Sequence, residues 1–294
     1  MTSTARSQLW REEHAPRGIV DGYVVANPPE LNLQFERDEY LFHGHEPAHT
    51  ASQLVELMDA HGVIRALLAP PPREDDSEET RIGHRFALEA VQQFPDRFGL
   101  TVRVNPHEGM NAVRQLTSMV QSDGAMALRL VPMRVGKPLN HKIFFPLYTK
   151  CVELGIPVTS TVGIPGPRVP GLMQHPKYLD ELCYLWPELT IVTTHGGEPW
   201  TRLLVKLMIK WPNLYHMISA FAPRYYPKHT IEFLNTSRGR QKVMFATDYP
   251  MISFERALTE LPDVPIASKS LPYFLYKNAL RVFWGEDAAA EGSD

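Results

Sequence analysis

Two segments of this 294-residue chain end an apolar run in a residue that can transfer protons. In KVMFATDYP (242–250) the run leads to Asp248, and in LTIVTTHGGEPW (189–200) it leads to His195. Carboxyl and imidazole groups held at fixed positions are typical of general acid–base catalysis. We therefore expect Asp248 to act as a general base and His195 as a general acid or a second base. The alternatives are that Asp248 only orients its loop and that His195 is a buried structural histidine.

Further polar side chains stand at or near the ends of other apolar runs. A guanidinium group there can hold a carboxylate or a developing oxyanion through two parallel hydrogen bonds. Arg129 could instead form an ion pair with Asp21 or Asp248, and Arg103 could point between the sheet and its helices. The expected substrate-binding residues are Arg129, Arg103, Tyr23, Thr161, Arg168 and Tyr249, of which Arg168 follows a Pro-Gly turn.

Amphipathic helices and apolar runs alternate along the chain and would position these residues. Strands are predicted at 18–25, 63–70, 97–104, 125–131, 156–162, 189–194, 214–219 and 242–247. About eight strands with helical patterns between them predict a parallel sheet closed into a (β/α)8 TIM barrel, an α/β fold of one domain. An open doubly wound sheet is the alternative. We expect an N-terminal arm over 1–17, the barrel over 18–284 and a disordered tail over 285–294.

Charge and composition exclude several classes of protein. The 30 Lys and Arg residues are balanced by 33 Asp and Glu residues, so no basic surface for nucleic acid is expected. No stretch approaches the roughly 20 apolar residues of a membrane span, and residues 1–18 have no apolar leader region. Cys151 and Cys183 fall among apolar helix residues, as is usual in a reduced compartment. The composition therefore predicts a cytoplasmic protein that binds a small molecule.

Several segments, in their order and spacing, resemble the amidohydrolase-related family, the ACMSD-like branch of metal-dependent TIM-barrel hydrolases and decarboxylases. The resemblance covers nearly the whole chain. The segments that carry it are SQLVELMDAHGV (52–63), HPKYLDELCYLWPELTIVTTHGG (175–197), IEFLNTSRGRQKVMFATDYP (231–250) and YKNALRVFWG (276–285). The resemblance implies a barrel enzyme with its site at the carboxyl ends of the strands, and a homodimer.

Members of this family generally bind a divalent metal through Asp-x-His-x-His on strand 1, a His after strand 5 and the Asp after strand 8. Here Tyr23 and Val25 stand in the two histidine positions of strand 1, and Thr161 stands in that of strand 5. Catalytic zinc needs about three N, S or carboxylate ligands. We therefore expect no metal cofactor. His43, His45 and His49 could in principle hold a metal, but loop or lid histidines are the expectation for that polar segment.

Without a metal-activated water, the enzyme would need an activated substrate or a reaction of proton transfers. The leading hypothesis is a metal-independent amidohydrolase-superfamily enzyme that hydrolyses a small carboxylated lactone, or a similar activated cyclic carbonyl compound. Asp248 and His195 would supply acid–base catalysis and the arginines would stabilise the anion. A decarboxylase, another lyase or an isomerase on the same barrel is the runner-up. A metal-dependent hydrolase with rebuilt ligands and a non-catalytic binding protein are the remaining alternatives.

Overall fold

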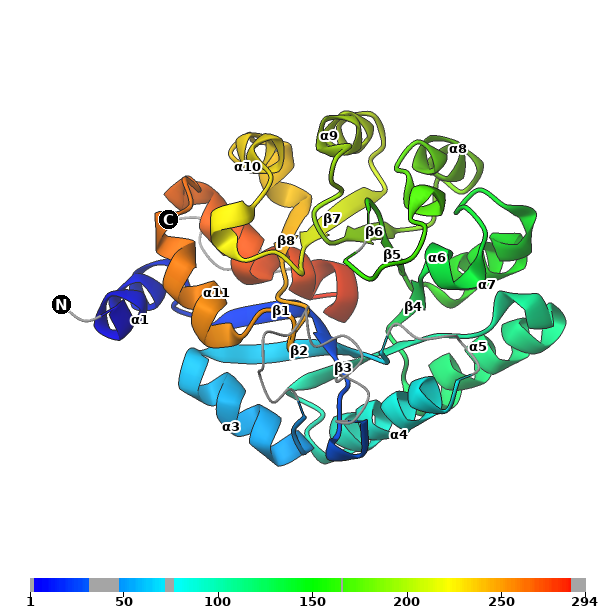
Figure 1. Ribbon diagram of the computed structural model, residues 1–294, viewed down its shortest axis with the longest axis horizontal. Coiled ribbons are helices and arrows are strands. Elements are labelled where there is room, and N and C mark those ends of the chain that lie inside the picture. The colour runs from blue at the N-terminus through cyan, green and yellow to red at the C-terminus, as the bar shows by residue number, and fades with distance from the viewer. Residues whose placement is uncertain (1–2, 32–47, 72–76, 165, 287–294) are drawn as a thin grey trace.

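Eight parallel strands form the centre of the computed structural model, which describes residues 3–31, 48–71, 77–164 and 166–286. They pair in the order β1 to β8, so each strand lies beside its neighbour in sequence (Figure 1). Their bounds are β1 Ile19–Val25, β2 Val63–Ala69, β3 Phe98–Val102, β4 Ala127–Leu130, β5 Val158–Thr161, β6 Ile191–Thr194, β7 Leu214–Ile218 and β8 Val243–Phe245. All eight predicted strands are confirmed.

The first and last strands meet through a few backbone contacts rather than a continuous ladder. Val24 and Tyr249 form an isolated parallel bridge, and the Val25 N–H donates to the Tyr249 carbonyl at 2.8 Å. The Asp248 N–H donates to the Tyr23 carbonyl at 2.9 Å. The sheet is therefore a nearly closed barrel of one domain, as predicted, and its closure brings strand 1 against Asp248.

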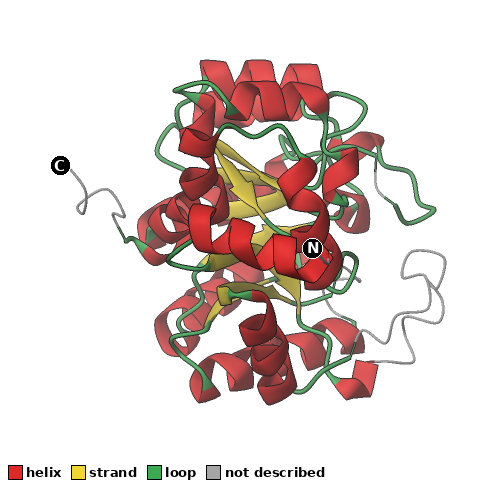
Figure 2. Ribbon diagram, turned by 90° about the vertical axis from the view of Figure 1, so that its left-hand side faces the viewer, coloured by secondary structure: helices red, strands yellow, loops and turns green. Residues whose placement is uncertain are grey.

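Helices surround the strands as an outer layer (Figure 2). They are α1 Ser3–His14, α3 Ala51–His61, α4 Glu78–Gln93, α5 Met110–Asp123, α6 Pro132–Val135, α7 Phe145–Leu154, α8 Tyr178–Leu185, α9 Thr201–Lys210, α10 Lys228–Leu234 and α11 Phe254–Glu260. Among the described residues, no helix is both long and apolar enough to cross a membrane. Cys151 and Cys183 are buried free thiols.

Local sequence signals fix the ends of these helices. Thr50 and Gln53 form a capping box at the start of α3, each side chain accepting a hydrogen bond from the other's backbone N–H. Gly62 ends α3 with φ 70°, and Gly155 ends α7 with φ 68°. This left-handed conformation favours glycine, which explains why both helices stop where the sequence predicted.

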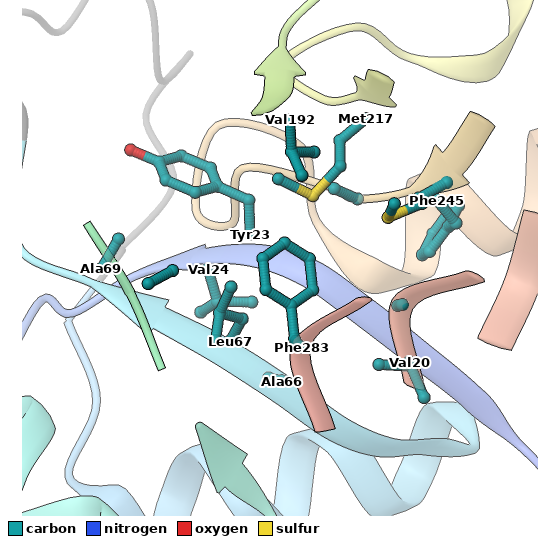
Figure 3. Packing of buried hydrophobic residues seen from close by; sticks show 14 of the residues in the cluster. Val20, Tyr23, Val24, Ala66, Leu67, Ala69, Val192, Met217, Phe245 and Phe283 are labelled. Atoms are coloured by element: carbon teal, nitrogen blue, oxygen red, sulfur yellow. The ribbon is translucent and has the colours of Figure 1, made fainter. Parts of the chain in front are cut away.

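One continuous apolar core packs the strands against the helices. Val192 of β6, Met217 of β7 and Phe245 of β8 belong to it, and Phe283 joins it from the C-terminal helical segment Leu280–Trp284 (Figure 3). Phe245, the last residue of β8, contacts Phe274 with ring centroids 5.8 Å apart. The phenol of Tyr23 points away from Phe283.

The predicted N-terminal arm contains helix α1, Ser3–His14. This helix contacts α11. Of the predicted tail, residues 287–294 lie outside the described residues. Most strands are shorter than predicted: β8 ends at Phe245, and the backbone N–H of Thr247 donates to Asp21 instead of continuing the ladder. A side-chain acceptor therefore releases the chain from the sheet just before Asp248.

Candidate active site at the carboxyl ends of the strands

Strained backbone marks the ends of three neighbouring strands. His195 after β6, Ala220 after β7 and Asp248 after β8 have φ values of 70°, 60° and 59°. Among the described residues they are the only ones other than glycine with positive φ. Such conformations cost free energy and concentrate at functional sites. This backbone geometry and the two predicted catalytic residues therefore single out the same end of the barrel.

Asp248 is a buried residue of the loop after β8. Its side chain is only 11% exposed. Burial raises the pKa of Asp248 well above its usual value, although the Arg129 charge acts in the opposite direction. Asp21, fully buried on β1, accepts hydrogen bonds from the Thr247 N–H and hydroxyl groups and so fixes the residue before Asp248. Burial therefore favours the protonated form of Asp248.

His195 lies beside this acid in the neutral form. Its Nδ1 atom is 3.0 Å from the Ser219 hydroxyl, which also accepts a hydrogen bond from the His195 backbone N–H at 2.9 Å. Burial and the nearby Arg129 charge lower the pKa of His195 well below its usual value. The His195 Nδ1 and Asp248 Oδ2 atoms are 4.0 Å apart. A small polar group could lie between them, whereas a direct short hydrogen bond is absent.

Arg129 places a buried positive charge next to this pair. Its side chain extends from β4 across two neighbouring strands, donating to the Thr161 hydroxyl at 2.6 Å and the Thr194 hydroxyl at 2.9 Å. The guanidinium carbon lies 4.6 Å from the centre of the Tyr23 ring. Within the described residues no carboxylate lies within 4.0 Å of it, so the expected alternative of an ion pair with Asp21 or Asp248 is not observed. Its Nε atom is buried without a hydrogen-bond partner.

Tyr23 and Arg103 border the same cluster. The Tyr23 ring stands edge-on to His195, with centroids 6.0 Å apart. Arg103 is buried and donates through Nη1 to the Pro71 carbonyl at 2.6 Å. Burial lowers the pKa of His84 on α4 to about 4, and the Arg103 charge adds to this effect. Burial raises the pKa of Tyr23, and the Arg103 charge opposes that rise. Arg103 thus lies between the barrel mouth and the outer helices, where its charge acts on both.

The remaining predicted residues lie at the edge of the cluster or away from it. Arg168 is exposed on the loop after β5, so it is not part of the buried group. Tyr249 stacks on Phe254 with centroids 4.9 Å apart, and its hydroxyl lies 3.1 Å from His49 Nδ1. Tyr249 therefore ties His49 to the loop after β8. His43 and His45 lie outside the described residues.

The structure adds polar residues to which the sequence analysis gave no role. Thr194 and Ser219 hold Arg129 and His195 in place, and Asp21 holds Thr247. Thr194 and Ser219 stand beside predicted strand ends, which is the signal that could have found them. Asn27, just after β1, is buried, and among the described residues neither of its side-chain polar atoms has a hydrogen-bond partner. The mouth therefore combines in one buried polar cluster a carboxyl group whose pKa burial raises, an imidazole whose pKa burial lowers, and a cation.

A parallel barrel with such a cluster at its carboxyl end belongs to the TIM-barrel enzymes. The amidohydrolase family model matches residues 47–284, so this chain belongs to the amidohydrolase family. No curated protein matches its sequence.

Solved structures of this fold are similar over nearly their whole length. An uncharacterized TIM-barrel protein from Bordetella bronchiseptica is 21% identical, with a TM-score of 0.73, over 90% of this chain and 97% of that chain. The 5-carboxyvanillate decarboxylase from Novosphingobium aromaticivorans, with bound manganese, is 18% identical, with a TM-score of 0.66, over 90% of this chain and 97% of that chain. The dihydroxybenzoic acid decarboxylase from Polaromonas sp. JS666, with manganese and 2-nitroresorcinol, is 16% identical, with a TM-score of 0.67, over 91% of this chain and 97% of that chain.

The expectation of no metal cofactor is corrected by these neighbours. Manganese is bound in both decarboxylases, so histidines missing from the sequence are not sufficient grounds to expect a metal-free protein of this fold. The described residues, however, contain no group of three His, Cys, Asp or Glu side chains that could hold a metal ion. His195 and Asp248 provide two donors, and the Arg129 cation beside them opposes a second positive charge. This donor set does not fit a divalent ion by itself.

Proposed function

We propose that the protein is a lyase that removes the carboxylate group of a small organic acid. The observation that supports this function best is the buried position of Asp248, which favours its protonated form, beside the Arg129 cation, which has no ionic partner among the described residues. A guanidinium binds a carboxylate, and a protonated carboxyl group donates a proton. Both functions that decarboxylation requires are therefore present in one cluster.

The reaction of this proposal is a replacement of the carboxylate group by a proton. The bond between the carboxylate carbon and its neighbour breaks, the electron pair stays on the neighbouring carbon, and carbon dioxide leaves. Asp248 supplies the proton to that carbon, and water later restores the Asp248 proton. Arg129 orients the leaving carboxylate, and the neutral His195 lies where it can accept or donate a hydrogen bond to the substrate.

Aromatic acids are the substrate class that we propose. The neighbours act on a carboxyvanillate and on a dihydroxybenzoic acid, as their names state. In this chain the Tyr23 and His195 rings lie edge to face beside Arg129, a surface on which a planar ring can pack. The enclosed position of Asp248 agrees with decarboxylation, which needs a dry pocket for the leaving group.

Lactone hydrolysis, which the sequence analysis favoured, remains a prediction and places different demands on the site. It requires an ionised Asp248 as base and a water molecule beside it. Burial of Asp248 favours its protonated form, which opposes the role of base near neutral pH. For this reason we place hydrolysis second.

Isotope incorporation separates the two reactions. The purified protein, supplied with manganese, is incubated in deuterium oxide with a panel of hydroxybenzoates and carboxyvanillates, and with carboxylated lactones. We expect carbon dioxide release and one deuterium at the vacated carbon of the product. We expect Asp248→Asn to lower the rate by at least about a hundredfold, with the exposed Asp96→Asn variant as the control. Ring opening without carbon dioxide, or full activity of Asp248→Asn, would contradict the proposal.

A further inference from the structure

Asn27 is a buried amide whose side chain makes no hydrogen bond with the described residues. The residue is 4% exposed, and neither Oδ1 nor Nδ2 has a partner in the part of the chain that the structure describes. The Asn27 backbone, in contrast, has a hydrogen-bond partner: its carbonyl accepts a hydrogen bond from the His49 N–H at 3.2 Å. The position of the residue is thus set by its main chain, and the side chain is not needed for that.

A buried amide without partners is unfavourable for folding. A buried polar atom that loses its hydrogen bonds to water and gains none lowers stability, and native structures contain few such atoms. A leucine has the same number and branching of side-chain heavy atoms and would avoid the penalty. The presence of asparagine therefore indicates a partner that binds after folding.

The path of the chain places this amide at the barrel mouth. The Ala26 N–H donates to the Ala69 carbonyl at 2.7 Å, so pairing with β2 continues beyond the end of β1. A residue before proline adopts an extended conformation, and Pro28 follows Asn27. The register of β1 is irregular between Asp21 and Val24, but the Tyr23 carbonyl and the Val25 N–H both bond to the chain after β8, as in a regular strand. Residues two apart in an extended chain share one face, so we expect Tyr23, Val25 and Asn27 to form one row. Tyr23, at the start of this row, lies beside Arg129 and His195.

We infer that Asn27 is a specificity-determining residue that binds a hydroxyl group of the substrate. This inference rests on the proposed carboxylate site at Arg129. An amide offers both a donor and an acceptor, and a hydroxyl group also does both, so the two can satisfy each other. The substrate class becomes a small carboxylate that carries a hydroxyl group on the side that faces β1.

Binding of matched probes tests this role. The affinities of benzoate and of its three monohydroxy derivatives are measured by calorimetry on the wild type and on Asn27→Leu and Arg129→Met. One hydrogen bond of this kind contributes about a tenfold gain in affinity. We expect at least one hydroxybenzoate to bind the wild type about tenfold more tightly than benzoate, and Asn27→Leu to abolish this preference while it still binds benzoate.

Thermal stability separates substrate binding from a structural role. Because Asn27→Leu removes unpartnered polar atoms, its Tm should equal or exceed that of the wild type. A clear fall in Tm would show that the amide supports the fold, for example through a buried water, and would overturn the inference. A hydroxyl preference that survives in Asn27→Leu would also overturn it and leave the carboxylate site intact.

The Arg129 variant identifies failure of the underlying proposal. Benzoate binding that persists unchanged in Arg129→Met would contradict the proposed carboxylate site, whatever Asn27 does. Binding of none of these probes by the wild type would overturn both.

Discussion

Replacement of Asp21 by asparagine is expected to change how the stability of the protein depends on pH. Asp21 is fully buried, and burial raises its pKa from 3.8 to about 7, against the opposing effect of its hydrogen bonds from Thr247 and Tyr23. Each pH unit between the two values corresponds to ~1.4 kcal/mol of differential stabilisation. Ionised Asp21 therefore costs the folded state about 4 kcal/mol relative to the unfolded chain.

The sign of the effect follows from proton binding. Between pH 3.8 and about 7, folded Asp21 keeps its proton and unfolded Asp21 loses it. Because the folded state binds more protons in this window, the free energy of unfolding falls as the pH rises and levels off above about 7. Asparagine cannot ionise, so the variant lacks this decline. The difference in unfolding free energy, variant minus wild type, should rise by up to about 4 kcal/mol across the window.

Urea unfolding followed by tryptophan fluorescence and circular dichroism, repeated from about pH 4 to about pH 8, measures this difference. Asparagine makes weaker hydrogen bonds to Thr247, and this loss changes the difference in unfolding free energy by the same amount at every pH. The test is therefore the slope of that difference against pH. Asp96→Asn is the matched control, because Asp96 is exposed and its variant should give a flat difference. A flat or falling difference for Asp21→Asn would refute the argument that burial dominates this carboxyl group.

Further predictions concern hydrogen bonds of the buried interior. Tyr226→Phe removes a buried hydroxyl without a partner and should leave stability equal or higher, whereas Tyr148→Phe loses the hydrogen bond to the Leu139 carbonyl and should cost about 1 kcal/mol. If urea unfolding gave the same loss of unfolding free energy for both variants, this prediction would be contradicted. The buried Lys242 donates to three backbone carbonyls, so Lys242→Met should lower the free energy of unfolding by roughly 2–4 kcal/mol. Unchanged unfolding would show that water can replace the ammonium group.

The barrel could be predicted from the sequence because each strand is a short, nearly continuous apolar run. A strand that is covered on both faces needs apolar residues at successive positions, and glycines such as Gly62 and Gly155 show where the preceding helices stop. The exact strand ends could not be predicted in this way. Thr247 leaves the ladder because its N–H donates to Asp21, a residue more than 200 positions away in the chain.

The candidate site could be predicted only in its outline. Strand-end placement identified Asp248, His195 and Arg129, because the carboxyl ends of parallel strands meet at one end of a barrel. The support of Arg129 depends on the register of three strands: Thr161 pairs with Thr194, and both reach the guanidinium from strands beyond β4. No local pattern encodes that register. The metal expectation failed for a different reason, since it was argued from ligands missing in the sequence, and the similar decarboxylases bind manganese.

The charges of the mouth connect carboxylate binding with proton donation. Burial raises the pKa of Asp248 and lowers the pKa of His195, and the Arg129 charge acts to lower the pKa of both. A bound carboxylate would pair with Arg129 and cancel that effect, so the pKa of Asp248 should rise further in the complex. Under the proposed function, this rise would keep the proton on Asp248 in the complex. A neutral ligand would leave the Arg129 charge in place, so the proposed site would favour an anionic ligand both in binding and in the protonation of Asp248.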